Sequence, residues 1–250
     1  YFCWDSMGKK SRINKYLSEV GFCSRREADK LISSGKVYLN GKKAILGDKV
    51  SMYDEVLVDN KKITPLIKYK IYIAFNKPLG IVCTTDKKRE KNNIIDYINF
   101  PHRIFPVGRL DKNSEGLIFL TNDGDIVNKI LRSKNNHQKE YDVTVDKPIT
   151  KRFIHEMQNG VPILDTVTKK CVLKQTGKKT FNIVLTQGLN RQIRRMCEYF
   201  GYSVKHLKRV RIMNIKLDVS RGKYRHITKS ELKEMKIMLS SSTKTHSEEK

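Results

Sequence analysis

Residues 105–124, FPVGRLDKNSEGLIFLTNDG, carry the strongest structural signal in the chain. A proline and a glycine near the start of this stretch predict an extended backbone that then bends. The apolar run Leu117–Leu120 is long enough for a buried strand and too short for a helix. Asp111, which follows Arg109 closely and precedes this strand, therefore stands where catalytic groups are often found. The plainer interpretation is a turn cap, because Asp is a leading turn residue.

A calcium loop is a second alternative for the same stretch. Asp111, Asn113 and the pair Glu115-Gly116 imitate the first half of a helix–loop–helix calcium site. The twelfth position of such a loop would be Asn122, where a bidentate Glu is required, and no amphipathic helix precedes it. We therefore exclude a calcium site.

The charge of the chain indicates its partners. The 250 residues include 51 Lys and Arg against 26 Asp and Glu, a formal net charge of +25. Such an excess favours a polyanion, most commonly nucleic acid. A membrane surface is the competing partner, but no apolar run approaches a membrane span and no N-terminal apolar segment resembles a signal peptide. At this length two folded units are more natural than one.

The cysteines and histidines give no sign of a metal centre. Five cysteines, at positions 3, 23, 83, 171 and 197, are scattered and never form a C-x-x-C pair. The six histidines show no ligand spacing either. We therefore expect no disulfide frame, no metal and a reducing cytoplasmic location.

A small helical module is predicted for residues 11–60. Apolar residues recur at helical spacing from Ile13 to Val20, and Ser24 with Glu27 forms a capping box that opens a second helix. Asn40-Gly41 is a strong hairpin signal. The preceding residues 1–10 lack periodicity, and we expect a disordered extension in which Met7 is a plausible natural start. The basic residues expected to meet phosphates are Arg12, Arg25, Arg26 and Lys36.

This module resembles the S-four-type RNA-binding domain. The residues that carry the likeness are RINKYLSEVGFCSRREADKLISSGKVYLNGK, positions 12–42. The resemblance implies that the second helix and the following hairpin grip structured RNA.

The rest of the chain predicts a linker over residues 61–69, a second domain over 70–237 and a disordered tail over 238–250. The pattern predicts strands at 71–75, 117–120, 139–145, 181–185 and 210–217, and helices at 94–98, 126–131, 153–157 and from 191. Strands and helices are mixed without a βαβ rhythm, and no Gly-rich nucleotide loop is present. The expected class is α+β: a small two-helix module, then a largely antiparallel sheet with flanking helices.

A second basic concentration lies at residues 191–211. It holds Arg191, Arg194, Arg195, Lys205, Lys208, Arg209 and Arg211, with Glu198 as the opposing charge. An ordinary amphipathic helix with an Arg194–Glu198 pair is one explanation. Seven positive charges in twenty-one residues nevertheless repel one another unless an anion sits among them.

Four segments together resemble the bacterial ribosomal pseudouridine synthases that carry an S-four-type domain: GRLDKNSEGLIFLTNDG, KEYDVTVDKP, GVPILDTVTKKC and GLNRQIRRMCEYFGYSVKHLKRVRIMNI. The likeness runs from about Arg12 to about Leu232. It implies that Asp111 is the catalytic aspartate, that Tyr141 is the active-site tyrosine and that Arg194 pairs with the aspartate. Arg109 corresponds to the arginine that fills the space of the flipped base. Further residues expected to contact RNA are Lys139, Asn190, Arg191, Arg195 and Lys208.

The resemblance further implies a cofactor-independent isomerase that acts as a monomer on a uridine of large-subunit ribosomal RNA, with a tRNA as a second candidate substrate. Conversion of uridine to pseudouridine neither adds nor removes atoms, so it needs no redox cofactor or metal. It needs an ionised carboxylate in a closed pocket and a flipped-out nucleotide. A nearby guanidinium, which stays charged, would oppose the rise in pKa that burial causes in a carboxylate.

Two other functions compete with this one. A non-catalytic RNA-binding protein would be expected to lose at least one of Arg109, Asp111, Tyr141 and Arg194, and all four are present. A glycoside hydrolase using Asp111 and Glu115 would leave the charge of +25 unexplained. Its two carboxylates would also lie on one local turn instead of flanking a sugar from two sides.

Overall fold

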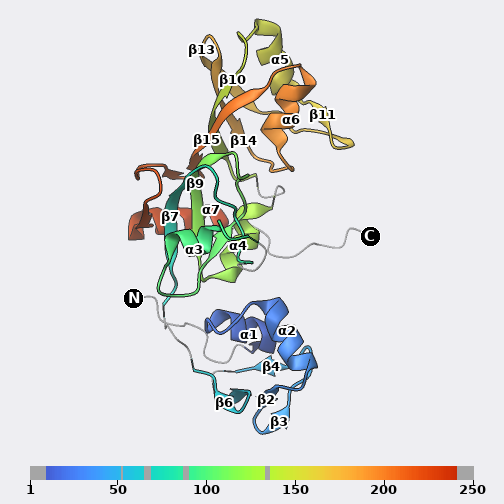
Figure 1. The fold of residues 1–250 in the computed structure, drawn as a ribbon, viewed down its shortest axis with the longest axis vertical. Coiled ribbons are helices and arrows are strands. Elements are labelled where there is room, and N and C mark those ends of the chain that lie inside the picture. Colours follow the sequence, from blue (N-terminus) through green and yellow to red (C-terminus); the bar gives the residue numbers. More distant parts are fainter. Residues whose placement is uncertain (1–9, 52, 65–68, 87–89, 133–135, 241–250) are drawn as a thin grey trace. The chain divides into compact units, whose positions relative to one another are not determined.

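The computed structural model of the chain describes residues 10–51, 53–64, 69–86, 90–132 and 136–240. They form two compact units (Figure 1). The first contains the residues up to Ile71 with the short segments 100–104 and 122–124, and the second contains the remainder. The expected N-terminal extension, apart from Lys10, and residues 241–250 of the expected tail lie outside the described residues.

The first unit joins two helices to short strands. Its elements are β1 (Ser11–Arg12), α1 (Ile13–Glu19), α2 (Arg25–Ser33), β2 (Val37–Leu39), β3 (Lys42–Lys43), β4 (Lys49–Val50), β5 (Val56–Val58) and β6 (Lys61–Lys62). Four strands form a sheet in the order β3-β2-β5-β6, and β1 pairs with β4. The helices bury Ile13, Leu17, Ala28 and Ile32 against Val37, Val56 and Val58 of the sheet.

The local signals of this unit are confirmed. Ser24 caps α2, since its side chain accepts a 3.1 Å hydrogen bond from the Glu27 backbone N–H. Asn40 and Gly41 adopt φ angles of 49° and 78°, the left-handed pair that a two-residue hairpin turn requires. The linker begins later than expected, because Lys61 and Lys62 pair with Val58 and Leu57 as the edge strand β6.

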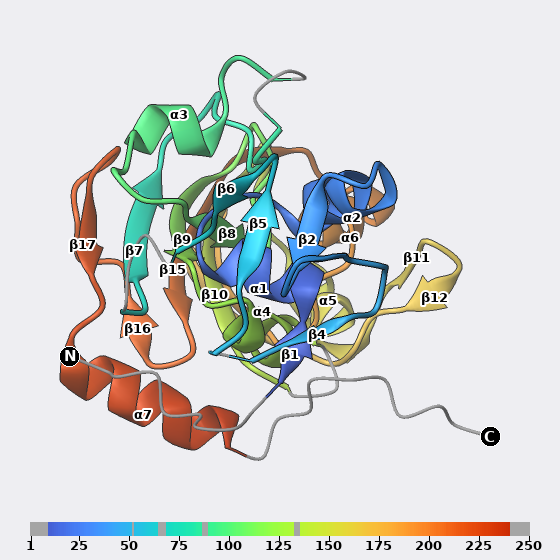
Figure 2. The same ribbon diagram turned by 90° about the horizontal axis from the view of Figure 1, so that it is seen from below.

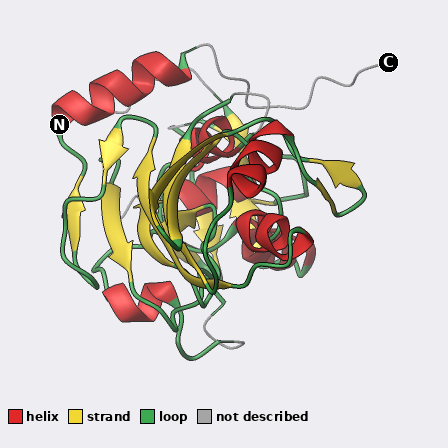
Figure 3. Ribbon diagram, turned by 90° about the horizontal axis from the view of Figure 1, so that it is seen from above, coloured by secondary structure: helices red, strands yellow, loops and turns green. Residues whose placement is uncertain are grey.

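The second unit is built on one large sheet, a curved layer with helices packed against it (Figure 3). Its strands are β7 (Tyr72–Lys77), β8 (Phe105–Val107), β9 (Glu115–Thr121), β10 (Lys139–Val145), β13 (Val172–Gly177), β14 (Thr180–Leu185), β15 (Val204–Ile212), β16 (Ile215–Lys216) and β17 (Tyr224–His226). The order is β13-β14-β10-β15-β9-β7-β17, with β8 beside β9 and β16 beside β15. Figure 2 shows β7 and β17 side by side at one end. The α+β class and the largely antiparallel sheet are therefore confirmed.

Two apolar clusters cover different parts of this sheet. The helices are α3 (Ile94–Ile98), α4 (Gly124–Leu131), α5 (Lys151–Asn159), α6 (Gln192–Tyr199) and α7 (Lys229–Leu239), and β11 (Pro162–Ile163) with β12 (Thr166–Val167) forms a separate hairpin. Helices α5 and α6 pack with β10, β13 and β14 around Phe153, Met157 and Phe181. Helices α4 and α7 pack with β7 and β9 around Phe119, Ile130 and Met235. No helix in the described ranges is both long and apolar enough to traverse a bilayer.

Two expectations about the C-terminal part were wrong. The strand expected at 210–217 begins at Val204, ends at Ile212 and folds back through Met213, whose φ is 54°, into β16. The expected tail begins too early, because α7 continues to Leu239, a residue only 3% exposed. The apolar face of that helix is what holds these residues against the sheet.

Strands β9 and β15 run parallel in the middle of the sheet, with Glu115 opposite Lys208 and Gly116 opposite Arg209. Gly116 has φ of 107°, and a Cβ added there would lie 2.3 Å from the Arg209 carbonyl oxygen. Only glycine allows this close approach of the two backbones. The pairing matters for function because β9 follows Asp111 directly.

Gly116→Ala is therefore expected to lower the free energy of unfolding by about 3 kcal/mol or more, since strain and a backbone clash coincide. Urea unfolding of the full chain would measure this. The matched control is Gly188→Ala, where an added Cβ meets nothing within 4 Å. Equal midpoints for the two variants would show that β9 and β15 are not held at this separation.

Candidate active site

Asp111 lies in the loop between β8 and β9, and neighbouring segments fix that loop. The Ser114 N–H donates to the Asp111 carbonyl at 3.0 Å, and the Gly80 N–H donates to the Lys112 carbonyl at 2.8 Å. The Leu110 N–H donates to the Cys83 thiol sulfur at 3.3 Å. The loop is thus held before, at and after the aspartate.

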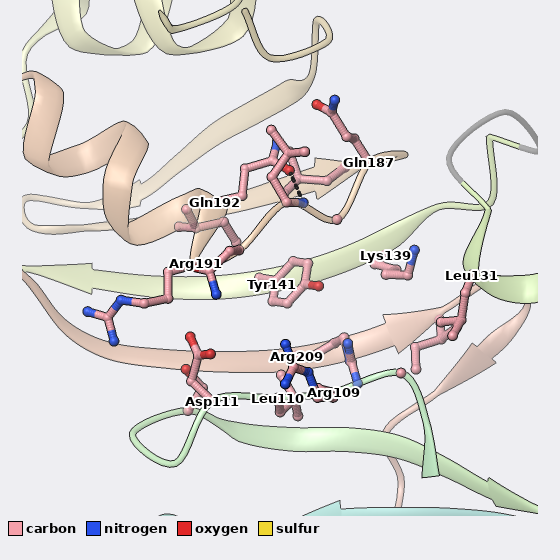
Figure 4. Close-up of a pocket in the computed structure, with 18 of the residues that line it drawn as sticks. Arg109, Leu110, Asp111, Leu131, Lys139, Tyr141, Gln187, Arg191, Gln192 and Arg209 are labelled. Atoms are coloured by element: carbon pink, nitrogen blue, oxygen red, sulfur yellow. Dashed lines mark hydrogen bonds between the residues drawn. The ribbon is translucent and has the colours of Figure 1, made fainter. Parts of the chain in front are cut away.

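The Asp111 side chain faces a pocket with a volume of about 460 Å³, within the usual range for small-molecule sites. The pocket collects residues from both apolar clusters, with Phe119 and Ile130 on one side and Leu185 and Ile193 on the other. Asp111 is the single carboxylate among the described residues that line it. Figure 4 shows this carboxylate pointing into the space below Tyr141 and Arg191.

Tyr141 and Arg209 approach the pocket from adjacent strands. They are paired across β10 and β15, and the Arg209 guanidinium carbon lies 5.9 Å from the centre of the Tyr141 ring. A register shift between Glu140 and Tyr141 leaves Val210 as an extra residue in β15. Bulges of this kind redirect side chains, and here Arg209 and Ile212 both line the pocket.

Arg194 does not form the salt bridge with Asp111 that the sequence led us to expect. Its guanidinium donates to the Asn113 carbonyl at 2.6 Å, the Ser114 hydroxyl at 3.2 Å and the Val204 carbonyl at 3.2 Å. It is 8% exposed and does not line the pocket. Burial lowers the pKa of Arg194, with the charge of Arg191 acting the same way and Asp111 opposing. Arg194 therefore links the loop that carries Asp111 to β15 through hydrogen bonds, and its charge interacts with the Asp111 carboxylate without direct contact.

The other predicted residues divide into three groups. Arg109, Lys139, Asn190 and Arg191 line the pocket. Arg195 lies outside the pocket and donates to the Asn190 carbonyl and side chain at 3.1 and 3.2 Å. Lys208 also lies outside it, on the opposite face of β15 from its neighbour Arg209. The exposed residues Arg12, Arg25, Arg26 and Lys36 belong to the first unit.

Two buried cations near the site were missed from the sequence. Lys77 is fully buried at the end of β7, where its ammonium group donates to the Pro78 and Ile81 carbonyls at 2.9 and 2.8 Å. Burial is the main cause that lowers its pKa. Arg209 was counted as part of a basic run, yet it is 4% exposed on the inward face of β15. Arg209 stands between the apolar residues Leu207 and Ile212, both of which are buried. This apolar pattern in the sequence could have indicated that Arg209 is buried too.

The site shows no metal centre within the described residues, where no group of three potential ligands gathers. The described cysteines, at 23, 83, 171 and 197, are free thiols. Burial raises the pKa of Cys83, the thiol beside the aspartate's loop, so this sulfur serves as a neutral acceptor.

Comparisons with known proteins show which proteins this chain resembles. Residues 71–199 match the family model of RNA pseudouridylate synthase, and residues 11–56 match that of the S4 domain. The chain is 58% identical over 223 residues to the dual-specificity RNA pseudouridine synthase RluF of Escherichia coli (strain K12), covering 88% of this chain and 77% of that protein. It is 32% identical over 236 residues to the ribosomal large subunit pseudouridine synthase B of Bacillus subtilis (strain 168), covering 91% and 96%. A solved structure described as a pseudouridylate synthase superimposes with a TM-score of 0.65 at 28% identity, covering 90% of this chain and 99% of that one.

Proposed function

This chain belongs to the RNA pseudouridylate synthase family, and we propose that it isomerises a uridine of large-subunit ribosomal RNA, with Asp111 as the catalytic carboxylate. A tRNA is the second substrate we propose, since the relative that is 58% identical is described as dual-specificity. The scattered free thiols support the cytoplasm as its location. As a member of this family, the enzyme is an isomerase that acts on RNA.

The observation that carries the site assignment is the lone carboxylate in a pocket otherwise rich in cations. Asp111 faces a cavity whose other charged lining residues among the described ones are Arg109, Lys139, Arg191 and Arg209. A single acid amid cations suits a polyanionic substrate on which one carboxylate performs the chemistry. The nucleotide must leave the RNA stack to enter such a pocket.

The residues then have separate roles in the isomerisation. The bond from uracil N1 to the sugar C1′ breaks, the base turns over, and a bond forms from uracil C5 to C1′. Asp111 acts either on the sugar or on the ring. The Tyr141 ring offers a surface on which uracil can stack, and its hydroxyl can accept the proton that leaves C5. Arg109, exposed at the rim, can fill the place that the flipped base leaves in the RNA.

Residues 11–60 supply affinity in this proposal, and the pocket unit supplies chemistry. Replacing Arg25 and Arg26 at the start of α2 with Gln should weaken RNA binding and flatten its salt dependence, by a slope of roughly 0.7–0.9 for each phosphate that the variant no longer neutralises. The rate at saturating RNA should not change. Filter binding across a salt series would measure the slope.

The control removes the same charge elsewhere, as Lys229→Gln with Lys233→Gln on the exposed side of α7. A salt slope that changes equally in both double variants would mean that the basic face of α2 has no special contact with RNA.

A further inference from the structure

Two buried cations in the pocket have no anionic partner among the described residues. Lys139 on β10 and Arg209 on β15 are 8% and 4% exposed, and both line the cavity that Asp111 faces. Neither forms an ion pair with a carboxylate of the described residues. Buried charges are normally paired, because leaving one unpaired in a poorly solvated site is costly.

The fold holds Arg209 firmly while leaving part of its guanidinium unused. Its Nε donates to the Leu117 carbonyl at 2.6 Å, which fixes the plane of the group. Its Nη2 is buried and has no hydrogen-bond partner in the part of the chain that the structure describes. Arg209 is paired with Tyr141 across the two strands, so its side chain lies on the face of the sheet that carries Tyr141. A rigid donor with a vacant N–H is the arrangement that stabilises charge on a reacting group.

Lys139 completes the pair on the adjacent strand. It lies two residues from Tyr141 along β10, and therefore on the same face of the sheet (Figure 4). Burial, together with the neighbouring charge of Arg209, lowers the pKa of Lys139 to about 8. At neutral pH the ammonium group remains mostly charged, which keeps two like charges in one small cavity.

We propose that Lys139 and Arg209 hold the carbonyl oxygens of the target uracil and stabilise the negative charge that these oxygens gain during the isomerisation. This inference rests on the proposed function of the Asp111 pocket. It assigns to the two cations a role in the chemical step, beyond general affinity for RNA.

The electrons of the step balance without a further reactant. When the N1–C1′ bond breaks, its electron pair remains on uracil and spreads over N1, O2 and O4. After the base has turned, electrons of the ring form the C5–C1′ bond, C5 loses its proton and N1 gains one. If Asp111 instead adds to ring carbon six, the displaced electrons move to O4. Both routes place negative charge on uracil oxygens, where a cation lowers the barrier.

A contact to the phosphate of the flipped nucleotide is the rival role for the same cations. Phosphate is fully charged before the reaction begins, so a phosphate ligand would contribute to binding and leave the rate at saturation unchanged. A group that meets developing charge would contribute to the rate. The two roles are therefore separable by measuring affinity and single-turnover rate on one set of variants.

The test uses the full-length enzyme in excess over total RNA from cells that lack its gene. Lys139→Met should lower the saturated single-turnover rate at pH 7 by about 10²- to 10³-fold, with little change in affinity. Lys139→Arg should restore most of the rate, because a charged donor returns. Lys174→Met, at an exposed position of β13, is the matched control and should behave as wild type. Thermal unfolding of each variant would identify a loss of fold.

The pH profile gives a signature that a structural role would not produce. The charged or titratable groups around Lys139 are Arg209, His137, Tyr141, Asp111, Arg109 and Arg191. The pKa of His137 is lowered, chiefly by burial, so this imidazole is neutral above pH 7. As pH rises through about 8, Lys139 loses its proton, and the wild-type rate should fall. Lys139→Arg should keep its rate to higher pH, and Lys139→Met should show no such fall.

The remaining outcomes would refute either the inference or the proposed function. A Lys139→Met enzyme that binds RNA weakly but reacts at the full rate once saturated would make Lys139 a phosphate ligand and refute the inference. A defect that Lys139→Arg leaves uncorrected, with an unaltered pH profile, would refute it as well. A wild-type enzyme that forms no pseudouridine in any RNA of the pool would instead refute the proposed function.

Discussion

Asp111→Asn is expected to reduce pseudouridine formation below detection while the protein binds RNA at least as tightly as wild type. The amide keeps the shape of the side chain but can neither attack carbon nor carry negative charge. Asp111 is the single carboxylate among the described lining residues, so no other acid in the pocket can replace it. Removing its charge from a site facing RNA phosphates favours binding. Single-turnover assays and filter binding on one preparation would measure both quantities.

The matched control for this variant is Asp142→Asn. Asp142 is exposed, on the strand that carries Tyr141, and it accepts a 2.9 Å hydrogen bond from Asn182. Its loss should leave the rate within a few-fold of wild type, since it does not line the pocket. An Asp111→Asn enzyme that retained a tenth of the wild-type rate would show that the catalytic group has been wrongly assigned.

Arg194→Met is expected to have the second largest effect, and to act on both stability and rate. The arginine donates to two backbone carbonyls and a hydroxyl, and two of those three acceptors belong to the residues Asn113 and Ser114 that follow the aspartate closely. Methionine fills a similar volume but leaves these acceptors without donors. The free energy of unfolding should fall by about 3 kcal/mol. The saturated rate should fall by about 10²-fold, because the loop carrying Asp111 is no longer held in place.

Arg195→Met provides the comparison on the same helix. Arg195 is only partly buried, and its hydrogen bonds go to the adjacent Asn190. This variant should unfold near the wild-type midpoint and bind RNA more weakly by about the contribution of one phosphate, an effect that salt diminishes. At saturating RNA its rate should equal that of wild type. If Arg194→Met and Arg195→Met were alike in both stability and rate, the hydrogen bonds from Arg194 of α6 to the loop that carries Asp111 would contribute nothing to function.

Much of the fold could be predicted from the sequence because the patterns that determine its elements lie within a few neighbouring residues. The cap at Ser24, the turn at Asn40-Gly41 and the buried strand β9 each depend on a few neighbouring residues. Helix α7 was missed although its signal was local too. Thr228 and Glu231 form a complete capping box, and Leu232, Met235 and Leu239 lie on one apolar face. The Lys- and Ser-rich sequence that follows obscured this pattern.

The parts of the site that could not be read depend on pairing between distant segments. Asp111 and Arg209 line the same pocket because β9 runs parallel to β15, and sequence spacing does not reveal such a pairing of strands. The bulge at Val210 places Ile212, and not Arg211, on the face that Leu207 and Arg209 share, and alternation alone could not predict this change. For the same reason Arg194 was expected on the aspartate itself, whereas the structure places it on the backbone that follows.

The most direct test of the central claim is a map of pseudouridine in the ribosomal and transfer RNA of three strains. One strain has the wild-type gene, one lacks it, and one expresses the Asp111→Asn enzyme at the wild-type level. We expect at least one uridine of large-subunit ribosomal RNA to be converted in the first strain alone. A full set of pseudouridines in the Asp111→Asn strain, or identical maps with and without the gene, would contradict the account.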